Sequence, residues 1–126
     1  IYAMERPAQT TIENWLNSPF ADATPVDSLN SIYADKCPFA YKKIIVFASD
    51  RPGGMGGFDL YYSTYEKGKW SSPENFGPNV NTASNEYRPV MAMLPNYSNY
   101  ILLFSSDRPG GKGGYDLYFR GITFDD

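Results

Sequence analysis

Two glycine-rich segments carry residue types whose spacing could support chemistry. The first, from Asp50 to Asp59, reads Asp-Arg-Pro-Gly-Gly-Met-Gly-Gly-Phe-Asp, and the second, from Asp107 to Asp116, reads Asp-Arg-Pro-Gly-Gly-Lys-Gly-Gly-Tyr-Asp. Each brings two carboxylates, one guanidinium group and a run of glycines close together in the chain. Such a set could cradle phosphate on backbone N–H groups, bind Ca²⁺ through oxygen atoms, or use paired carboxylates for glycoside hydrolysis.

The context of the two segments argues against these chemistries. Neither is followed by Gly-Lys-Ser/Thr and a helical pattern, which a phosphate-binding loop requires. The segments nearly match the calcium-binding nonapeptide Gly-Gly-x-Gly-x-Asp, but the aspartate comes one residue late and the copies are not in tandem. The chain has no His, the commonest general base and metal ligand. We therefore expect no catalytic residue, no metal and no cofactor, with a calcium site as the open alternative.

We interpret both segments as tight turns that are stabilised by their own residues. In the first turn, Asp50 is expected to accept N–H bonds from residues two or three positions further on, and the glycines are expected to take positive φ. Asp59 is expected to pair with Arg51 and to join the two ends of the turn. The predicted structural turn residues are Asp50, Arg51, Gly53, Gly54, Gly56, Gly57 and Asp59, followed by Asp107, Arg108, Gly110, Gly111, Gly113, Gly114 and Asp116.

The tips of the two turns are candidates for contact with a partner. Met55 in the first turn is replaced by Lys112 in the second, whereas the glycines on either side are the same. A position that varies within an otherwise constant loop is expected to be exposed. Met55 and Lys112, together with Arg51 and Arg108, are the predicted interaction residues.

The turns belong to a repeat whose copies are 57 residues apart. An apolar run precedes each turn, at Ile44–Ala48 and at Ile101–Ser105. Because both runs are continuous and not alternating, we expect strands with both faces buried. With the strands Phe58–Ser63 and Tyr115–Arg120 after the turns, each repeat consists of about four short strands and one long connection.

A degenerate earlier copy of the repeat is predicted at the start of the chain. The matched positions are Ile1-Tyr2 with Leu60-Tyr61, Asp27-Ser28 with Asn81-Thr82, and Asn30 with Asn85. Trp15 likewise matches Trp70, so we expect Thr11–Trp15 to be a strand. The alternative is a short helix across Thr11 to Asn17, which Thr10 or Thr11 could cap and which carries Glu13 in its first turn.

Composition limits the fold and the class of function. Aromatic residues make up 17% of the 126 residues, and 11 Gly and 10 Pro add turn formers, so short strands and tight turns are expected. The net charge of −3 provides no basic face for nucleic acid. No apolar run approaches the ~20 residues of a transmembrane span. Cys37 is the only cysteine, so no intrachain disulfide is expected.

These patterns predict an all-β fold made of β-propeller blades, each with four antiparallel strands. Residues 1–27 are expected to end a preceding blade and to include its connector, residues 28–84 to form a blade with its connector, and residues 85–126 to form another blade. About two and a half blades leave flat faces open, whereas a propeller closes with about four to eight. We therefore expect further blades of the same chain, or identical copies, to complete an otherwise incomplete propeller.

The motif Phe-[Ala/Ser]-Ser-Asp-Arg, followed by a glycine turn and Asp-Leu-Tyr, resembles the repeat of the TolB-type, WD40-like β-propellers, also called the PD40 repeat. The long glycine turn and the connector Asn75-Phe-Gly-Pro-Asn-Val-Asn-Thr82 are similar to the version found in cell-envelope proteins of Bacteroidetes. The resemblance implies a non-catalytic scaffold in the periplasm or at the outer membrane. Its implied partners are other cell-envelope proteins, within assembly or secretion machinery.

Two other functions stay open at this point. A carbohydrate-binding, lectin-like propeller would use surface aromatic side chains, for which the candidates are Tyr61, Tyr62, Tyr65, Tyr87, Tyr97, Tyr100 and Tyr118. A sialidase-like glycosidase fragment would need convergent carboxylates with an arginine cluster. Ser49-Asp50 and Ser106-Asp107 match part of the Asp box of such propellers, but its Thr-Trp is absent at the required spacing.

Overall fold

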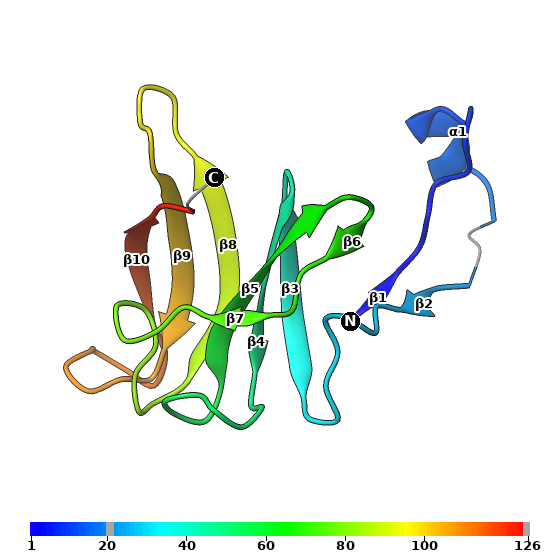
Figure 1. Cartoon of the computed structure of the whole chain (residues 1–126). Coiled ribbons are helices and arrows are strands. Elements are labelled where there is room, and N and C mark those ends of the chain that lie inside the picture. The colour runs from blue at the N-terminus through cyan, green and yellow to red at the C-terminus, as the bar shows by residue number, and fades with distance from the viewer. Residues whose placement is uncertain (20–21, 125–126) are drawn as a thin grey trace.

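The computed structural model describes residues 1–19 and 22–124. Apart from one short helix, the regular elements of these residues are antiparallel strands in three sheets, and none of the sheets closes (Figure 1). The predicted all-β class is confirmed at this level. The described part of the chain has no helix long and apolar enough to cross a membrane.

The three sheets follow one another along the chain. The N-terminal sheet pairs β1 with β2, and helix α1 lies between them in sequence: β1 (Tyr2–Ala3), α1 (Ile12–Leu16) and β2 (Thr24–Pro25). The central sheet has the order β3-β4-β5-β6, and β7 also pairs with β5: β3 (Asp35–Tyr41), β4 (Ile44–Ser49), β5 (Asp59–Glu66), β6 (Lys69–Trp70) and β7 (Glu74–Asn75). The C-terminal sheet has the order β10-β9-β8: β8 (Glu86–Met93), β9 (Tyr100–Ser106) and β10 (Asp116–Ile122).

Strand β4 lies between the other two sheets and is buried on both faces (Figure 1). Ile44, Val46 and Ala48 belong to a core cluster shared with the C-terminal sheet. Ile45 and Phe47 belong to a second cluster, shared with the N-terminal part of the chain. Because alternate residues of a strand point to opposite faces, a strand covered on both sides needs a continuous apolar run. The predicted double burial is confirmed for this strand.

Strand β9 is buried on one face only. Leu102 and Phe104 are buried in the cluster shared with the central sheet, whereas 37% of Leu103 is exposed. The prediction that Ile101–Ser105 is covered on both faces is therefore wrong for this strand. The physical reason is that no described segment packs against its outer face, although the apolar residues for such a contact are present.

Residues Ile12–Leu16 form a helix, so the predicted strand at Thr11–Trp15 is wrong. The Thr11 hydroxyl accepts a hydrogen bond from the backbone N–H of Asn14 at 3.1 Å, and Glu13 lies in the first turn. The capping alternative is thus the correct one. A strand needs a neighbouring ladder for its backbone groups, whereas a capped helix satisfies them within the segment.

The match of Ile1 with Leu60 is borne out by their hydrogen bonds. The backbone N–H of Leu60 donates to Asn81 Oδ1 at 2.8 Å, and Asn81 Nδ2 donates back to Leu60 O at 3.0 Å. In the same way, the amino group of Ile1 donates to Asn30 Oδ1, and Asn30 Nδ2 donates back to Ile1 O at 2.8 Å. β1 also pairs with β2 as Tyr61-Tyr62 of β5 pairs with β7. The N-terminal sheet therefore reproduces the β5–β7 part of a repeat.

The same bonds correct the predicted register of the connector. Asn30 occupies the place of Asn81, so the pairings of Asp27-Ser28 with Asn81-Thr82 and of Asn30 with Asn85 are wrong. The β3–β4 turn has two residues between the paired Tyr41 and Ile44, whereas a longer loop separates the corresponding pair, Ala92 and Ile101. This longer loop shifts the numbering of one copy against the other.

Strand β8 carries Pro89 and lies at an edge of the C-terminal sheet. Its register with β9 shifts between Tyr87 and Val90, where Arg88 has a φ of 50°. Strand β3 has the same shift of register with its neighbour, β4. There Cys37, which precedes Pro38, has a φ of 52°. A bulge at each proline interrupts the regular ladder, so the N–H that proline lacks is not needed for a ladder hydrogen bond. An edge position also tolerates a residue without an N–H.

Candidate functional site

Arg51 fastens the first glycine turn to the connector before β3. Its Nη2 donates to the backbone oxygen of Leu29 at 2.7 Å and to Asp35 Oδ1 at 2.5 Å, and its Nε donates to Ser49 Oγ at 3.0 Å. The guanidinium lies 5.2 Å from the ring centroid of Phe47 and 5.1 Å from that of Tyr61. The predicted pair of Arg51 with Asp59 is therefore wrong, because Asp35 takes the arginine.

Arg108 makes the same set of contacts in the second turn. It donates to the backbone oxygen of Val80 at 2.7 Å, to Glu86 Oε1 at 3.1 Å and to Ser106 Oγ at 3.0 Å. Its guanidinium is stacked over the rings of Phe104 and Tyr118, with distances of 5.3 and 4.6 Å to the ring centroids. Glutamate replaces aspartate as the acidic partner, and both are almost fully removed from solvent. The two arginine clusters are thus equivalent joints between adjacent parts of the repeat.

The charge of Asp35 is stabilised within its cluster. Burial of the carboxyl group opposes ionisation, but hydrogen bonds from Arg51, Ser31 and Ser49 outweigh it and hold the pKa of Asp35 below its usual value of 3.8. The sequence interpretation did not identify Asp35 and Glu86 as the partners of the two arginines. The sequence does contain a signal for these two acids, because each begins the strand that precedes an apolar run. The two hairpins have loops of different length, which shifts the numbering and hides the equivalence of Asp35 and Glu86.

The aspartates that open the two turns receive bonds from the connector. Asp50 Oδ1 accepts from the backbone N–H of Ala34 at 2.8 Å. The prediction that it accepts from residues further on in its own turn is therefore wrong. Asp107 accepts from the side chain of Asn85 at 2.9 Å and from its backbone N–H at 2.7 Å. These two bonds hold the pKa of the Asp107 carboxyl below its usual value of 3.8. Each turn is thus tied to the preceding connector by its opening aspartate and by the arginine that follows it.

The aspartates that close the two turns accept from backbone N–H groups. Asp59, of which 1% is exposed, accepts from Met55 N at 2.6 Å, Gly56 N at 3.0 Å and Asn75 Nδ2 at 2.8 Å. Asp116 accepts from Lys112 N at 2.7 Å and Gly113 N at 3.3 Å. A carboxylate held in this way is occupied in shaping the loop. Among the described residues, no group of three or more His, Cys, Asp or Glu could hold a metal ion.

The glycines of the turns have two different roles. Gly53 and Gly110 have φ values of 91° and 94°, as predicted for a turn. The expectation of positive φ is wrong for the other glycines of these loops. Gly54, Gly56, Gly57 and Gly111 are required for space, whereas a Cβ on Gly113 or Gly114 would meet nothing within 4 Å among the described residues. A Cβ on Gly56 would lie 2.0 Å from the backbone oxygen of Ser84, and a Cβ on Gly57 would lie 2.3 Å from the side chain of the adjacent Asn85.

The predicted interaction residues fall into two groups. Met55 is 45% exposed and Lys112 is also exposed at the turn tip. The side chains of Arg51 and Arg108 are only 15% and 19% exposed, and their guanidinium groups are engaged in the clusters described above. The tip residues therefore remain the accessible part of the set, and their role as an interaction site remains a prediction.

The candidate tyrosines do not form one surface. Tyr61 and Tyr118 stack on the arginines, and Tyr87 packs edge-on against Phe58, with ring centroids 5.3 Å apart. Tyr97 is 67% exposed on the β8–β9 loop, far from these rings in sequence. Most of the tyrosines therefore serve the packing between the sheets.

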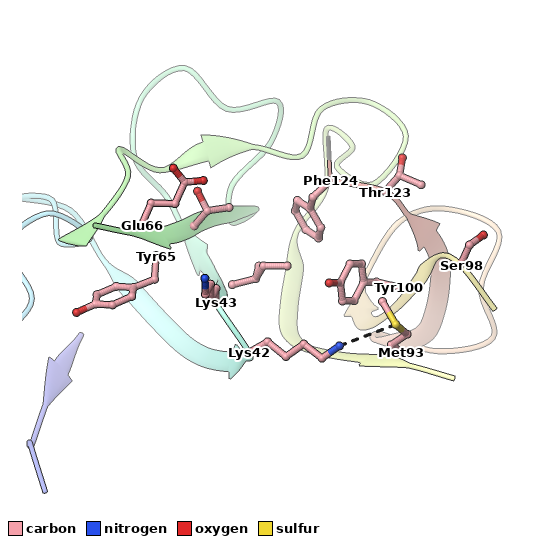
Figure 2. A pocket seen from close by; sticks show the side chains of 11 residues that line it. Lys42, Lys43, Tyr65, Glu66, Met93, Ser98, Tyr100, Thr123 and Phe124 are labelled. Atoms are coloured by element: carbon pink, nitrogen blue, oxygen red, sulfur yellow. Dashed lines mark hydrogen bonds between the residues drawn. The ribbon is translucent and has the colours of Figure 1, made fainter. Parts of the chain in front are cut away.

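A cleft of about 660 Å³ opens between the central and C-terminal sheets, at the ends opposite the glycine turns (Figure 2). Figure 2 shows Tyr65 and Glu66 of β5 on one side and Tyr100 with Phe124 on the other. The rings of Tyr100 and Phe124 meet edge to face, with centroids 5.5 Å apart. The β3–β4 turn adds two lysines to the lining, Lys42 and Lys43. The cleft thus combines aromatic surface with positive charge.

The comparisons with known proteins give no assignment. No family model matches the chain, and neither a curated protein nor a solved structure matches it. The resemblance to the TolB-type repeat therefore rests on the residue pattern of the turns and connectors alone.

Proposed function

We propose that the chain is part of a non-catalytic β-propeller scaffold that mediates protein–protein interaction in the periplasm or at the outer membrane. The observation that carries the proposal is the pair of equivalent arginine clusters around Arg51 and Arg108. Each ties a glycine turn and the first strand of its own sheet to the connector that precedes that sheet. Repeated joints between face-to-face antiparallel sheets favour stacked propeller blades.

The engagement of the acidic residues favours a structural role over catalysis. Asp59 is buried and accepts three N–H bonds, and Asp50 and Asp107 cap backbone N–H groups of the connectors. A catalytic carboxylate must face a space where substrate can bind. These carboxylates are instead occupied by N–H groups of the turns and connectors, so the preferred function is a rigid frame that presents exposed loops such as Met55 and Lys112 to other cell-envelope proteins.

The proposal is tested by measuring which proteins the chain retains from separate cell fractions. The immobilised chain is incubated with periplasmic, outer-membrane and cytosolic extracts of a Bacteroidetes species, and retained proteins are identified by mass spectrometry. We expect retention from the envelope extracts that falls when Met55→Asp and Lys112→Glu are combined. Ile12→Asn serves as a matched exposed control, since it lies on α1 and away from the turns. Equal retention from cytosolic extract, or retention unaffected by the paired tip variant, would contradict the proposal.

The cleft favours carbohydrate binding as a second candidate function. Sugar rings stack on aromatic side chains, and acidic sugars pair with lysine. Tyr100 and Phe124 supply the rings, and Lys42 and Lys43 supply the charge. Titration with an oligogalacturonate, against a neutral oligosaccharide of the same length, should perturb NMR signals of the cleft if this function is correct. Loss of the response in Lys43→Ser would assign it to the cleft, and an equal response to both sugars would contradict recognition of the acidic group.

A further inference from the structure

Four exposed cations lie on the two hairpins that meet between the central and C-terminal sheets. Residues 36–49 include Lys36, Lys42 and Lys43, residues 87–106 include Arg88, and neither range contains an aspartate or a glutamate. All four residues are exposed. The chain as a whole carries 14 acidic and 11 basic residues, so the charge of these hairpins is opposite in sign to the net charge of the chain.

The nearby acidic residues do not neutralise these cations. Asp35 and Glu86, which begin β3 and β8, are each paired with the arginine of their own cluster. Glu66 of β5 lines the cleft together with Lys42 and Lys43, but no ion pair joins it to either lysine (Figure 2). In the part of the chain that the structure describes, the four cations therefore have no anionic partner and leave a positive field at this surface.

Two of the cations lie at the end of the hairpins that is near the glycine turn. Lys36 Nζ lies 5.0 Å from the ring centroid of Phe58. The ring of Phe58 in turn packs against Tyr87, the residue before Arg88, with centroids 5.3 Å apart. Neutral aromatic side chains thus connect Lys36 of the central sheet with Arg88 of the C-terminal sheet.

The other two cations lie at the cleft. Lys42 Nζ lies 4.0 Å from Met93 Sδ, so this lysine reaches from the β3–β4 turn to the end of β8, and Lys43 lines the same cleft (Figure 2). β3 and β8 are edge strands of their sheets and lie side by side between the two pairs of cations (Figure 1). Lys36 and Lys42 are six positions apart, which is about 20 Å along a strand. We call the four cations and the two strands between them the basic strip.

Two of the cations have a backbone conformation that disfavours a side chain. Lys42 has a φ of 53° at the first position of a two-residue hairpin turn, where glycine is the usual residue. Arg88 has a φ of 50° before Pro89. Residues that are not glycine rarely adopt such a φ, and those that do are concentrated at functional sites. The charged side chains at these two positions therefore support a role in binding.

We propose that the basic strip binds an extended acidic polypeptide segment, with carboxylates at both of its ends and apolar side chains between them. The inference rests on the proposed scaffold function, for which it names the chemistry of a partner. Charge complementarity requires an anionic occupant, because the four cations have no acid of their own.

The middle of the strip favours a polypeptide over an acidic polysaccharide. Residues 38–41 read Pro-Phe-Ala-Tyr and residues 89–93 read Pro-Val-Met-Ala-Met, so neither stretch offers a cation. A polysaccharide with a carboxylate on every ring would place charged groups against these residues without a partner, which is unfavourable. A polypeptide can place apolar side chains there and keep its carboxylates for the two ends.

The segment is expected to bind through its side chains and not as an added strand. Pro38 and Pro89 lack an N–H, and the bulges at these residues interrupt both edges. Lysine and proline also protect an edge against other strands, but acidic residues would protect it equally well. Edge protection therefore does not account for the single sign of the charge on both hairpins.

The probe is a fluorescently labelled synthetic peptide of about eight residues, which is long enough to span the strip. It has two aspartates at each end and alanine, valine and leucine between them. Fluorescence anisotropy should show saturable binding to the chain that weakens as salt is raised from about 0.02 M to about 0.5 M, since the Debye length shortens. A peptide of the same composition with its aspartates in the middle should bind about threefold more weakly. Equal binding of the two peptides would overturn the proposed arrangement of the charges.

Paired variants assign the binding to the strip. Lys36→Gln combined with Lys42→Gln removes one cation from each end and should weaken binding by about fivefold. Lys67→Gln combined with Lys69→Gln is the matched control, because both lysines are exposed on the β5–β6 hairpin and the net charge changes equally. The control pair should bind within about twofold of the wild-type chain. An equal loss in the two paired variants would show a nonspecific effect of charge and overturn the inference.

Lys42→Gly separates a role in binding from a structural role. Glycine adopts a positive φ without strain, so this variant should unfold at a higher urea concentration and yet bind the peptide more weakly. Lys67→Gly is the matched control, since Lys67 has a φ of 49° and lies outside the strip. It should also gain stability, with peptide binding unchanged. A Lys42→Gly chain that binds as tightly as the wild type would overturn the assigned role of Lys42.

An oligogalacturonate tests the other class of anion, because the strip shares Lys42 and Lys43 with the cleft. If this sugar binds as tightly as the peptide and loses affinity in the Lys36→Gln, Lys42→Gln chain, the inference is overturned in favour of an acidic polysaccharide. Absence of saturable peptide binding would also overturn it. Retention of envelope proteins that still depends on Met55 and Lys112 would then leave the proposed function standing. Peptide binding without any such retention would instead support the strip and contradict the proposed function.

Discussion

The central and C-terminal sheets are built from the same repeat but differ in what covers them. Val46 and Leu60 in the central sheet are fully buried, whereas their counterparts Leu103 and Leu117 are 37% and 79% exposed. The local chain is nearly identical in the two regions, so sequence alone does not determine the burial of a residue in a repeat. The neighbouring unit supplies the burial, and an end unit keeps an apolar face without a partner.

The largest expected effect tests whether the two arginine clusters are equivalent joints. Arg51→Leu and Arg108→Leu each leave a buried carboxylate without its cation, which costs about 3–5 kcal/mol in comparable buried pairs. We expect similar losses in the free energy of unfolding, measured by urea denaturation. Arg120→Leu is the matched control, because that arginine is exposed and makes a single hydrogen bond to Asn79. A large effect from only one of the two cluster variants would break the equivalence.

A second pair of variants tests the difference in burial directly. Leu60→Ala removes a fully buried side chain and should destabilise by about 2–5 kcal/mol. Leu117→Ala removes its exposed counterpart and should change stability by less than about 0.5 kcal/mol. Equal losses in urea denaturation would show that the C-terminal face is covered in the single chain.

A third pair compares the asparagines that hold the β5-type strands. Asn81→Ala leaves the buried backbone N–H of Leu60 without its partner, at a cost of about 1–3 kcal/mol, whereas the oxygen of Leu60 keeps its bond from the Phe76 N–H at 3.2 Å. Asn30→Ala frees only the partly buried Ile1 and should cost less. Hydrogen exchange of the Leu60 amide measures the first effect locally. Unchanged protection of that amide in Asn81→Ala would contradict the assigned role.

The smallest expected effect is the pH dependence of the two lowered carboxyl pKa values. A carboxyl whose pKa is lower in the folded than in the unfolded chain stabilises the fold above the unfolded value and loses this contribution as pH falls through the folded value. For Asp35, stability should therefore be constant above about pH 5 and fall below the unfolded value of 3.8. Asp35→Asn should flatten this acid limb, and Asp107→Asn should flatten it less, because Asp107 is only partly buried and has no cationic partner among its hydrogen bonds. An acid limb that is unchanged in Asp35→Asn would contradict the assignment.

Part of the fold could be predicted because it follows from local pattern. The continuous run at Ile44–Ala48 predicts a strand buried on both faces, which the structure confirms. The match of Ile1 with Leu60 also holds. The strand predicted at Thr11–Trp15 fails, because repeat matching outweighed the local capping signal of Thr11.

The candidate site was less predictable, because its key contacts join residues that are distant in sequence. Arg51 could pair with Asp59 by proximity in the chain, yet it pairs with Asp35 across the β3–β4 hairpin. The loop glycines Gly56 and Gly57 look like turn formers, yet the connector packed on them sets their requirement. The sequence of the loop itself indicates neither the partner of Arg51 nor the crowding at Gly56 and Gly57.

By itself, the sequence determined the repeat, the all-β class and the positions of the turns, since these depend on spacing, strand propensity and backbone conformation. Only the tertiary structure decided which acid each arginine pairs with, which glycines are crowded and which apolar face stays open. These features depend on what one unit places against the next. A residue pattern specifies the surface that a unit offers, whereas burial and pairing require the second surface to be present.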